Sequence, residues 1–181
     1  VREVYSSKPS ITEKSLSFEP STIRPIFIVG MPHSGTTLVE QIISSHHAVY
    51  GDSKFSYLSS LIGPMVRNHI TQGSTKASTT IGDIKLNIAD TYSLPEEALL
   101  SIRQQYLDAI SRFDVPENVI TDKLPLNFRF IGFILSSFPE AKIVRLKRDA
   151  RATCWSNYQC FFTNKENGYS YNFEDLAGFY G

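Results

Sequence analysis

Short runs rich in apolar residues recur along this chain, separated by stretches with helical spacing. The runs at residues 26–29, 119–121 and 143–146 are too short for helices, and each is bounded by polar or turn-forming residues. The run at 26–29 is continuously apolar, which is typical of a strand that a parallel sheet buries on both faces. The pattern therefore predicts three strands, with residues 26–29 in the centre of the sheet.

Helix-forming stretches lie between and after these strands. They cover residues 36–45, 57–70, 126–138 and 150–161, and a further helix begins near residue 172. Pro64 is expected to break or kink the second of them. Alternation of strands and helices predicts an α/β fold in three layers, a parallel sheet with helices on both faces.

A capping-box sequence at residues 93–96 predicts the start of one more helix. Five apolar residues recur on one face of that helix: Leu99, Ile102, Tyr106, Ile110 and Phe113. Residues 1–24 are polar without a clear period and are expected to form an N-terminal extension. Residues 71–92 are rich in Thr, Ser, Gly and Asp, which predicts a long loop of the kind that serves as a lid.

The segment between the first strand and the first helix carries the strongest chemical signal. Gly30 and Gly35 bracket a GxxxxG frame, which between a strand and a helix is typical of a phosphate-binding loop. Gly35 lets the backbone approach an anion, and the free N–H groups and dipole of the helix start attract it. Thr36 stands where a lysine for the β- and γ-phosphates normally follows. The loop therefore predicts binding of a phosphate-like group, not necessarily a triphosphate; the alternative is a tight turn that binds nothing.

Cationic residues follow the other two predicted strands. Lys123 comes after residues 119–121, and Arg148 follows residues 143–146, with Ser156 eight residues further on. Because ligands bind beyond the carboxyl ends of parallel strands, these groups are expected to converge with the glycine loop. An arginine fork and a serine hydroxyl can hold a second phosphate. Taken alone, the cluster around Arg148 favours a solvated basic turn; together with the glycine loop it favours a second phosphate site.

Composition sets wider bounds. The 181 residues fit one domain, and a formal net charge of +0 gives no argument for nucleic acid or an anionic membrane as partner. No segment reaches the roughly 20 apolar residues of a membrane span, and the polar N-terminus lacks a signal-peptide core, so we expect a cytoplasmic location. Cys154 and Cys160 fit neither a zinc site nor a redox pair and are expected to be reduced core thiols. The sequence shows no metal-ligand cluster.

Three stretches together resemble the sulfotransferases that use 3′-phosphoadenosine-5′-phosphosulfate (PAPS). The resemblance is strongest to the branch with tyrosylprotein sulfotransferases and bacterial sulfotransferases that follow tetratricopeptide helices. Residues 26–43 look like the family's P-R/K-S-G-T-T loop, residues 121–128 like its D-K-x-P-x-N-F stretch, and residues 148–156 like its 3′-phosphate motif. The resemblance implies a P-loop-like domain over residues 25–181. Because the family domain normally continues further, this chain is expected to be truncated at its C-terminus.

The resemblance also implies roles for individual residues. The reaction would move a sulfuryl group from PAPS to a hydroxyl or amine acceptor and leave adenosine 3′,5′-bisphosphate (PAP), with no metal required. Lys123 would stabilise charge on the bridging oxygen, and Arg148 and Ser156 would hold the 3′-phosphate. The 5′-phosphosulfate would lie on the loop, formed by Pro32, His33, Ser34, Gly35, Thr36 and Thr37. The acceptor stays open between a protein tyrosine, a carbohydrate hydroxyl, an amine and a small phenol.

Two positions depart from the family pattern. His33 stands where the branch usually has arginine, and Lys54 stands where it usually has a glutamate base. We hypothesise a charge exchange in which Lys54 supplies the positive charge and keeps His33 neutral as the base. Asp52 and Asp122 are the alternative bases. The other interpretation is that both changes belong to a weak or inactive protein.

Two other functions compete with the transferase. A P-loop kinase or NTPase would use Asp122 for magnesium, but the loop lacks its lysine and Lys123 follows the aspartate directly. A non-catalytic nucleotide- or anion-binding protein would bind the donor without turnover. Aromatic residues near Ser156 are read as core, with Trp155 left open as a platform for adenine: Trp155, Tyr158, Phe161 and Phe162.

Overall fold

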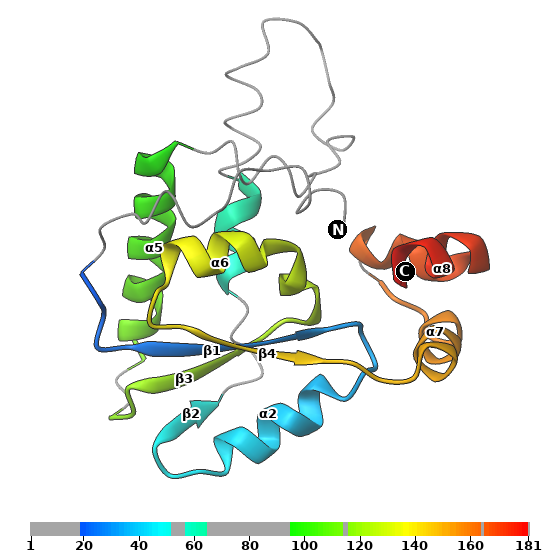
Figure 1. Cartoon of the computed structure of the whole chain (residues 1–181), viewed down its shortest axis with the longest axis horizontal. Coiled ribbons are helices and arrows are strands. Elements are labelled where there is room, and N and C mark those ends of the chain that lie inside the picture. Colours follow the sequence, from blue (N-terminus) through cyan, green and yellow to red (C-terminus); the bar gives the residue numbers. More distant parts are fainter. Residues whose placement is uncertain (1–18, 52–56, 65–94, 114–115, 164, 181) are drawn as a thin grey trace, which may run out of the picture.

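A four-stranded parallel sheet forms the centre of the fold (Figure 1). The structure is a computed structural model that describes residues 19–51, 57–64, 95–113, 116–163 and 165–180. Its strands are β1 (Arg24–Gly30), β2 (Val49–Gly51), β3 (Val119–Lys123) and β4 (Lys142–Leu146), in the order β2-β3-β1-β4. The three predicted strands and the parallel α/β class are confirmed. The three-residue strand β2 was not predicted, because it is too short to show a period.

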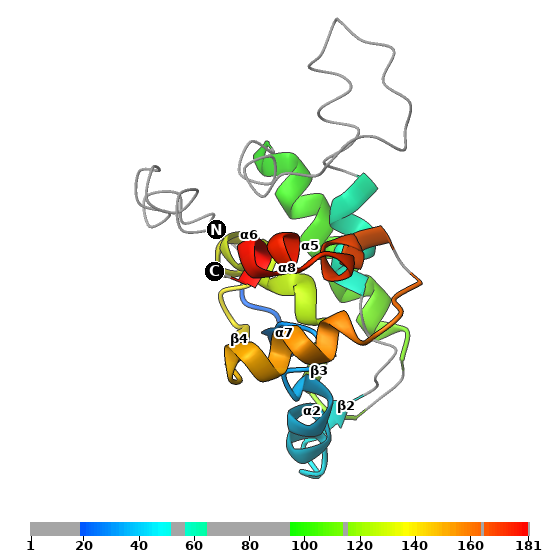
Figure 2. The same ribbon diagram turned by 90° about the vertical axis from the view of Figure 1, so that its right-hand side faces the viewer.

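Helices cover both faces of this sheet. Helix α2 (Thr36–Ser44) lies on one face, and α5 (Glu96–Ser111) and α6 (Ile131–Ser137) lie on the other (Figure 1). The 3₁₀ helix η2 (Pro125–Phe130) leads into α6, and residues 57–64 form a further helix. Beyond the carboxyl ends of the strands lie α7 (Ala150–Tyr158), the 3₁₀ helix η3 (Lys165–Tyr171) and α8 (Phe173–Tyr180) (Figure 2). The predicted three layers are therefore confirmed.

Several helix boundaries differ from the predicted ones. Helix α5 begins at Glu96 with Pro95 as its N-cap and no side-chain cap bond, so the predicted capping-box start is wrong. Pro95 itself is extended, with φ −65° and ψ 155°, so the helical turns begin at the next residue. The predicted helix at 126–138 is split into η2 and α6, and α7 ends at Tyr158 instead of continuing to residue 161.

The main core lies between β1 and helices α5 and α6. Phe27, Tyr106 and Phe138 meet there with ring centroids 5.0–5.9 Å apart, and all three side chains are buried. The predicted apolar face of α5 packs on this cluster, with Ile102 and Ile110 buried. Aromatic pairs in this geometry add about 0.5–1.5 kcal/mol each to the free energy of apolar burial.

A buried ion pair joins α5 to the turn after α6. Arg103 Nη1 lies 2.8 Å from Glu140 Oε1 and donates a 2.7 Å hydrogen bond to the Ser137 carbonyl. Both charged side chains are nearly inaccessible to water. Because each charge would be costly to bury alone, the pair fixes how α5 and α6 pack against each other.

The two cysteines were expected to be reduced thiols in the core. Cys154 and Cys160 are free thiols, but both are half-buried, so their predicted place in the core is wrong. They lie in or next to α7, outside the main sheet-and-helix core. Within the described ranges, none of the helices has the length and apolar character needed to cross a membrane.

Candidate active site

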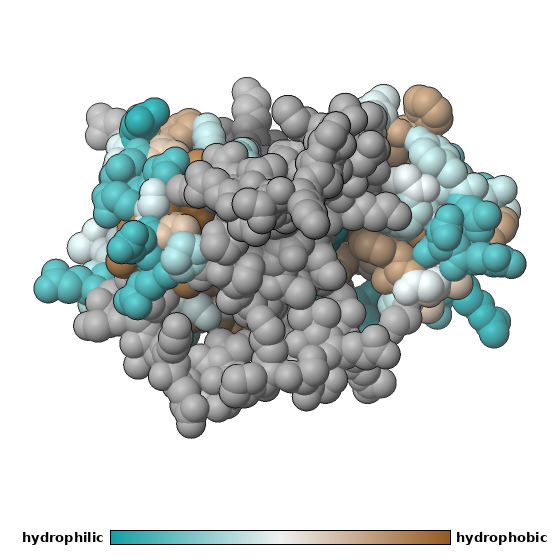
Figure 3. Space-filling model, turned by 90° about the horizontal axis from the view of Figure 1, so that it is seen from above, coloured by the Kyte–Doolittle hydropathy of each residue, from teal (hydrophilic) through white to brown (hydrophobic). Residues whose placement is uncertain are grey.

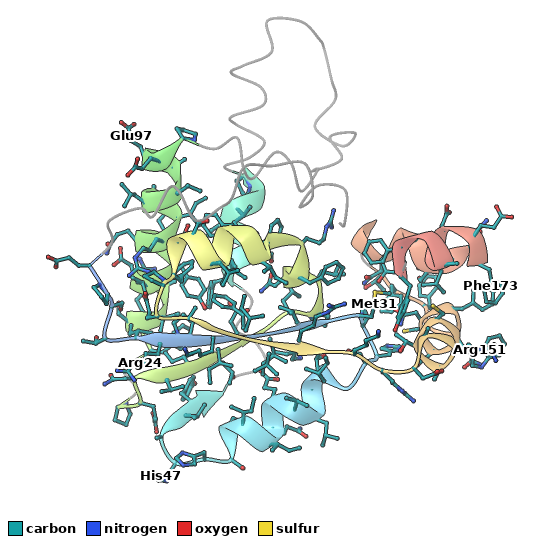
Figure 4. The ribbon with its side chains drawn as sticks, in the orientation of Figure 1. Arg24, Met31, His47, Glu97, Arg151 and Phe173 are labelled. Carbon is teal, nitrogen blue, oxygen red and sulfur yellow. The ribbon has the colours of Figure 1, made fainter. Side chains whose placement is uncertain are left out.

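The carboxyl ends of three parallel strands bring the candidate site together. Strand β1 ends at Gly30, β3 at Lys123 and β4 at Leu146. The loop after β1 begins with Met31, which lies at this edge of the sheet beside α7 (Figure 4). The predicted convergence is confirmed, because Lys123 contacts Thr37 and Arg148 contacts His33 in the loop.

The loop between β1 and α2 is shaped by backbone conformations that suit glycine. Gly35 is the N-cap of α2 with φ 100°, and His33 has φ 63°. A Cβ atom on Gly30 would lie 2.8 Å from the Leu146 carbonyl oxygen and 2.9 Å from Ser34 Oγ, so no side chain fits there. No side chain caps α2 and its first turn holds no acidic residue. The N–H groups at this helix start are thus suited to an anion.

One hydroxyl inside the loop is well placed for a ligand. Ser34 Oγ is buried and has no hydrogen-bond partner within the described part of the chain. A buried hydroxyl without a hydrogen-bond partner is unfavourable, so binding of a group that accepts a hydrogen bond from Ser34 would be favoured. The loop residues therefore fit an anionic group.

Lys123 reaches this loop from the end of β3. Its Nζ lies 3.5 Å from Thr37 Oγ1 and 3.7 Å from Glu40 Oε2. The lysine side chain is 15% exposed and the Glu40 side chain only 5%. A cation therefore stands at the helix start, where it can add to the attraction for an anion.

Glu40 is a site residue that the sequence analysis missed. In helix α2 the buried residues are polar: Thr36 and Glu40 are buried, whereas Leu38 is 62% exposed and Ile42 61%. A signal was present: Glu40 follows Thr36 by four residues and Thr37 by three, which puts it on the same helix face as the loop threonines.

Asp122 points to the other face of the sheet from Lys123. Tyr106 donates its hydroxyl to Asp122 Oδ2 at 3.2 Å, and Asn127 Nδ2 donates to Oδ1 at 3.1 Å. Burial raises the pKa of Asp122 to about 7, against smaller lowering effects from these hydrogen bonds. The carboxyl is 1% exposed, so it suits holding β3 to α5 and η2 better than acting as a base or a magnesium ligand.

Arg148, Ser156 and His33 meet on the other side of the loop. Arg148 Nη1 donates to the His33 carbonyl at 3.0 Å. His33 Nδ1 lies 2.9 Å from Ser156 Oγ and 3.1 Å from the Ser156 carbonyl, so it accepts from the hydroxyl or donates to the carbonyl, depending on its tautomer. Arg148 and Ser156, the two residues predicted to bind a second phosphate, thus both contact His33 in the loop between β1 and α2.

Three further contacts hold this arrangement in place. Asn157 Nδ2, which is buried, donates to the Pro32 carbonyl at 2.7 Å and ties α7 to the loop. Asp149 caps α7 by accepting from the Ala152 N–H at 2.9 Å. Tyr180 in α8 donates its hydroxyl to the Arg148 carbonyl at 2.9 Å. None of these supporting residues was predicted, since each acts on a partner distant in sequence or on a backbone group.

Aromatic residues in α7 and just after it are exposed at the surface, so the prediction that they belong to the core is wrong. Trp155 is 55% exposed, Phe161 is 82% exposed, and Tyr158 stacks on Phe173 with ring centroids 3.9 Å apart. Apolar side chains accordingly reach the surface at the end of the molecule formed by α7 and α8 (Figure 3). The prediction failed because α7 buries its polar residues Thr153 and Asn157 against the loop.

Two of the predicted site residues and the predicted long loop cannot be placed. Lys54, Asp52 and the loop at residues 71–92 are outside the described residues. In the ranges that are described, no group of three His, Cys, Asp or Glu side chains could hold a metal ion.

Comparison with known proteins gives a consistent result. The model of the sulfotransferase family matches residues 25–180. An uncharacterized protein of Aquifex aeolicus is 36% identical over 173 residues, which are 95% of this chain and 21% of that protein. The protein-tyrosine sulfotransferase of Drosophila melanogaster is 26% identical over 131 residues, which are 72% of this chain and 24% of that protein.

Two further similarities complete the comparison. Protein-tyrosine sulfotransferase 1 of Danio rerio is 26% identical over 132 residues, 72% of this chain and 34% of that protein. The crystal structure of sulfotransferase STF9 from Mycobacterium avium is 15% identical, with a TM-score of 0.43 over 87% of this chain and 49% of that one. The chain thus spans between a fifth and a third of the length of the curated relatives it matches.

Proposed function

The chain belongs to the sulfotransferase family, and on that premise we propose that it transfers a sulfuryl group from PAPS to a hydroxyl or amine acceptor. Residues 25–181 would form the transferase domain and residues 1–24 an extension. In the reaction the S–O bond to the phosphate breaks, a new S–O or S–N bond forms, and the acceptor loses a proton. The products are the sulfated acceptor and PAP.

The observation that carries the proposal is the meeting of Lys123 with the anion loop at Thr37. The two residues are 86 positions apart in sequence, and Nζ lies 3.5 Å from Oγ1. When the S–O bond breaks, negative charge grows on the oxygen that stays with the phosphate. An ammonium group held at the loop favours that charge, and donors of this kind are worth about 10²–10³ in rate.

The donor's two phosphate ends would lie on the two sides of the loop. Its 5′-phosphosulfate would contact Ser34 and the backbone N–H groups that start α2, and its 3′-phosphate would contact Arg148 and Ser156. Support comes from the direct contacts of Arg148 and Ser156 with His33 in the loop. An arginine fork and a hydroxyl are suited to a phosphate.

His33 is the residue we propose as base, with Lys54 as its cationic neighbour. In the tautomer whose Nδ1–H donates to the Ser156 carbonyl, Nε2 of His33 carries the lone pair that would accept the acceptor's proton. If this is right, His33→Ala will bind PAP but lose most of its transfer rate. A full rate in that variant would contradict the role of His33 and leave the donor site untouched.

Calorimetric titration with PAP tests the proposed donor, with ATP plus magnesium as the competing ligand. We expect selective binding of PAP that Arg148→Ala weakens by at least about tenfold. Arg145→Ala is the matched control, because Arg145 is an exposed arginine on β4 just before the site. Binding of ATP instead would favour the P-loop kinase, and binding of neither would refute the proposal. PAP binding without any transfer would indicate a non-catalytic relative.

A further inference from the structure

Helix α2 buries a carboxylate on the face where a helix normally buries apolar side chains. Glu40 is 4% exposed, whereas its apolar neighbours Leu38 and Ile42 face the surface. Burial of a charged group is unfavourable unless a partner compensates for it. The inverted arrangement therefore indicates that the Glu40 carboxylate is held at this place by an interaction.

Lys123 supplies such an interaction. Glu40 Oε2 lies 3.7 Å from Lys123 Nζ, which also lies 3.5 Å from Thr37 Oγ1. Thr37 and Glu40 are three residues apart on α2, so one helix face offers the ammonium both an oxygen of the anion loop and a carboxylate. We call these three residues the lysine clamp.

Without a nearby carboxylate, the Lys123 ammonium would be unfavourable at the start of α2. The start of α2 carries about half a positive charge, which repels a cation brought close to it. A lysine side chain is also flexible and strongly hydrated, so without a nearby acceptor it would extend into water. A carboxylate five residues into the helix offsets both effects.

We infer that Glu40 is the positioning residue of Lys123, holding its ammonium at the anion loop before a ligand arrives. This inference rests on the proposed function in one respect: that function identifies the anion as PAPS or PAP. It has a second consequence: the incoming phosphate must share the ammonium with Glu40. Removal of the carboxylate charge should therefore loosen the lysine and strengthen ground-state binding of the anion.

Lysine-resolved acetylation tests the position of Lys123 directly. The protein is treated briefly with acetic anhydride, and the rate at each lysine is read by mass spectrometry. In Glu40→Gln we expect Lys123 to react about three to ten times faster, because its ion pair is lost. Lys142 and Lys147, exposed lysines of β4 and the segment after it, should keep their rates.

A matched pair of variants separates contact from net charge. Gln41→Glu adds a carboxylate at the adjacent, exposed position of α2, and the double variant Glu40→Gln/Gln41→Glu keeps the net charge of the helix. We expect the double variant to behave like Glu40→Gln. A wild-type rate at Lys123 in the double variant would overturn the inference, and so would an unchanged rate in Glu40→Gln. Equal acceleration at all three lysines would indicate general loosening of the fold and would also overturn it.

PAP titration of the same variants links the clamp to the ligand. Glu40→Gln should bind PAP about three to ten times more tightly than wild type. Unchanged or weaker binding would refute the sharing of the ammonium. If wild type does not bind PAP at all, the proposed function fails, whereas the acetylation rates still decide whether Glu40 positions Lys123.

Discussion

The buried carboxyl of Asp122 offers a quantitative test of how the end of β3 is held. Its pKa is raised from 3.8 to about 7, chiefly by burial and to a smaller extent by the nearby charge of Glu40. Between these two pH values the folded protein keeps a proton that the unfolded chain has released. The stability that this proton contributes is therefore fully present below about pH 3.8 and is lost as the pH rises through 7.

The magnitude follows from the two pKa values. The difference between 3.8 and about 7 corresponds to roughly 4 kcal/mol in the free energy of unfolding, at 1.36 kcal/mol per pKa unit. Asp122 is 1% exposed, so solvent does not screen this contribution. Asp122→Asn cannot titrate, so its stability should lack this contribution to the pH dependence.

Urea unfolding between pH 4.5 and 8 gives the measurement. The free energy of unfolding of Asp122→Asn, minus that of wild type, should rise with pH by about 1 kcal/mol per unit and level off above pH 7. Asp108→Asn, which changes an exposed carboxylate on α5, should show no such rise. A difference that stays constant across the pH range would refute the reasoning, because it would mean that Asp122 is ionised in the folded protein throughout.

Three further substitutions have expected outcomes. Arg103→Ala leaves Glu140 buried without its ion-pair partner and should lower the free energy of unfolding by about 3–5 kcal/mol, measured by urea denaturation. Gly30→Ala places a Cβ atom 2.8 Å from the Leu146 carbonyl oxygen, so it should distort the loop and abolish PAP binding in calorimetry. Ser156→Ala should weaken binding of PAP about five- to twentyfold and leave adenosine 5′-phosphate binding within twofold, since it removes one donor to the 3′-phosphate.

Each of these substitutions has a control or an outcome that would contradict it. Arg112→Ala removes an exposed arginine just after α5 and should change stability by less than about 0.5 kcal/mol. Gly178→Ala adds a Cβ atom that meets nothing within 4 Å, so PAP binding should persist. Equal losses for PAP and adenosine 5′-phosphate in Ser156→Ala would mean that Ser156 supports the loop as a whole.

Local patterns predicted the elements that local physics controls. The apolar run of β1 and the glycine frame after it were recognisable because burial on both faces and positive φ angles restrict the residue types at each position. The face of α5 was likewise predicted from its period. The start of α5 was not, because Pro95 overrode a capping sequence that was otherwise favourable.

Local sequence patterns could not predict which residues the site residues contact. Arg148 and Ser156 could be paired with the loop only through the expected order of strands and a resemblance to a family. That His33 contacts Ser156, 123 residues away, required the packing of α7 across the loop. The burial of Glu40 on α2 was not predicted, because its partner Lys123 reaches that helix from the end of β3, 83 residues further along the chain.

The sequence by itself determined the parallel α/β class and the glycine-bracketed loop between β1 and α2, because these follow from short-range spacing and backbone geometry. The binding of phosphate groups at this loop stays a prediction. Only the tertiary structure decided which charges meet. Lys123 is paired with Glu40 and Thr37, and Asp122 is withdrawn from solvent on the opposite face of the same strand. Successive residues of a strand point to opposite faces, so the helices packed on each face determine that Lys123 lies at the loop and Asp122 inside the fold.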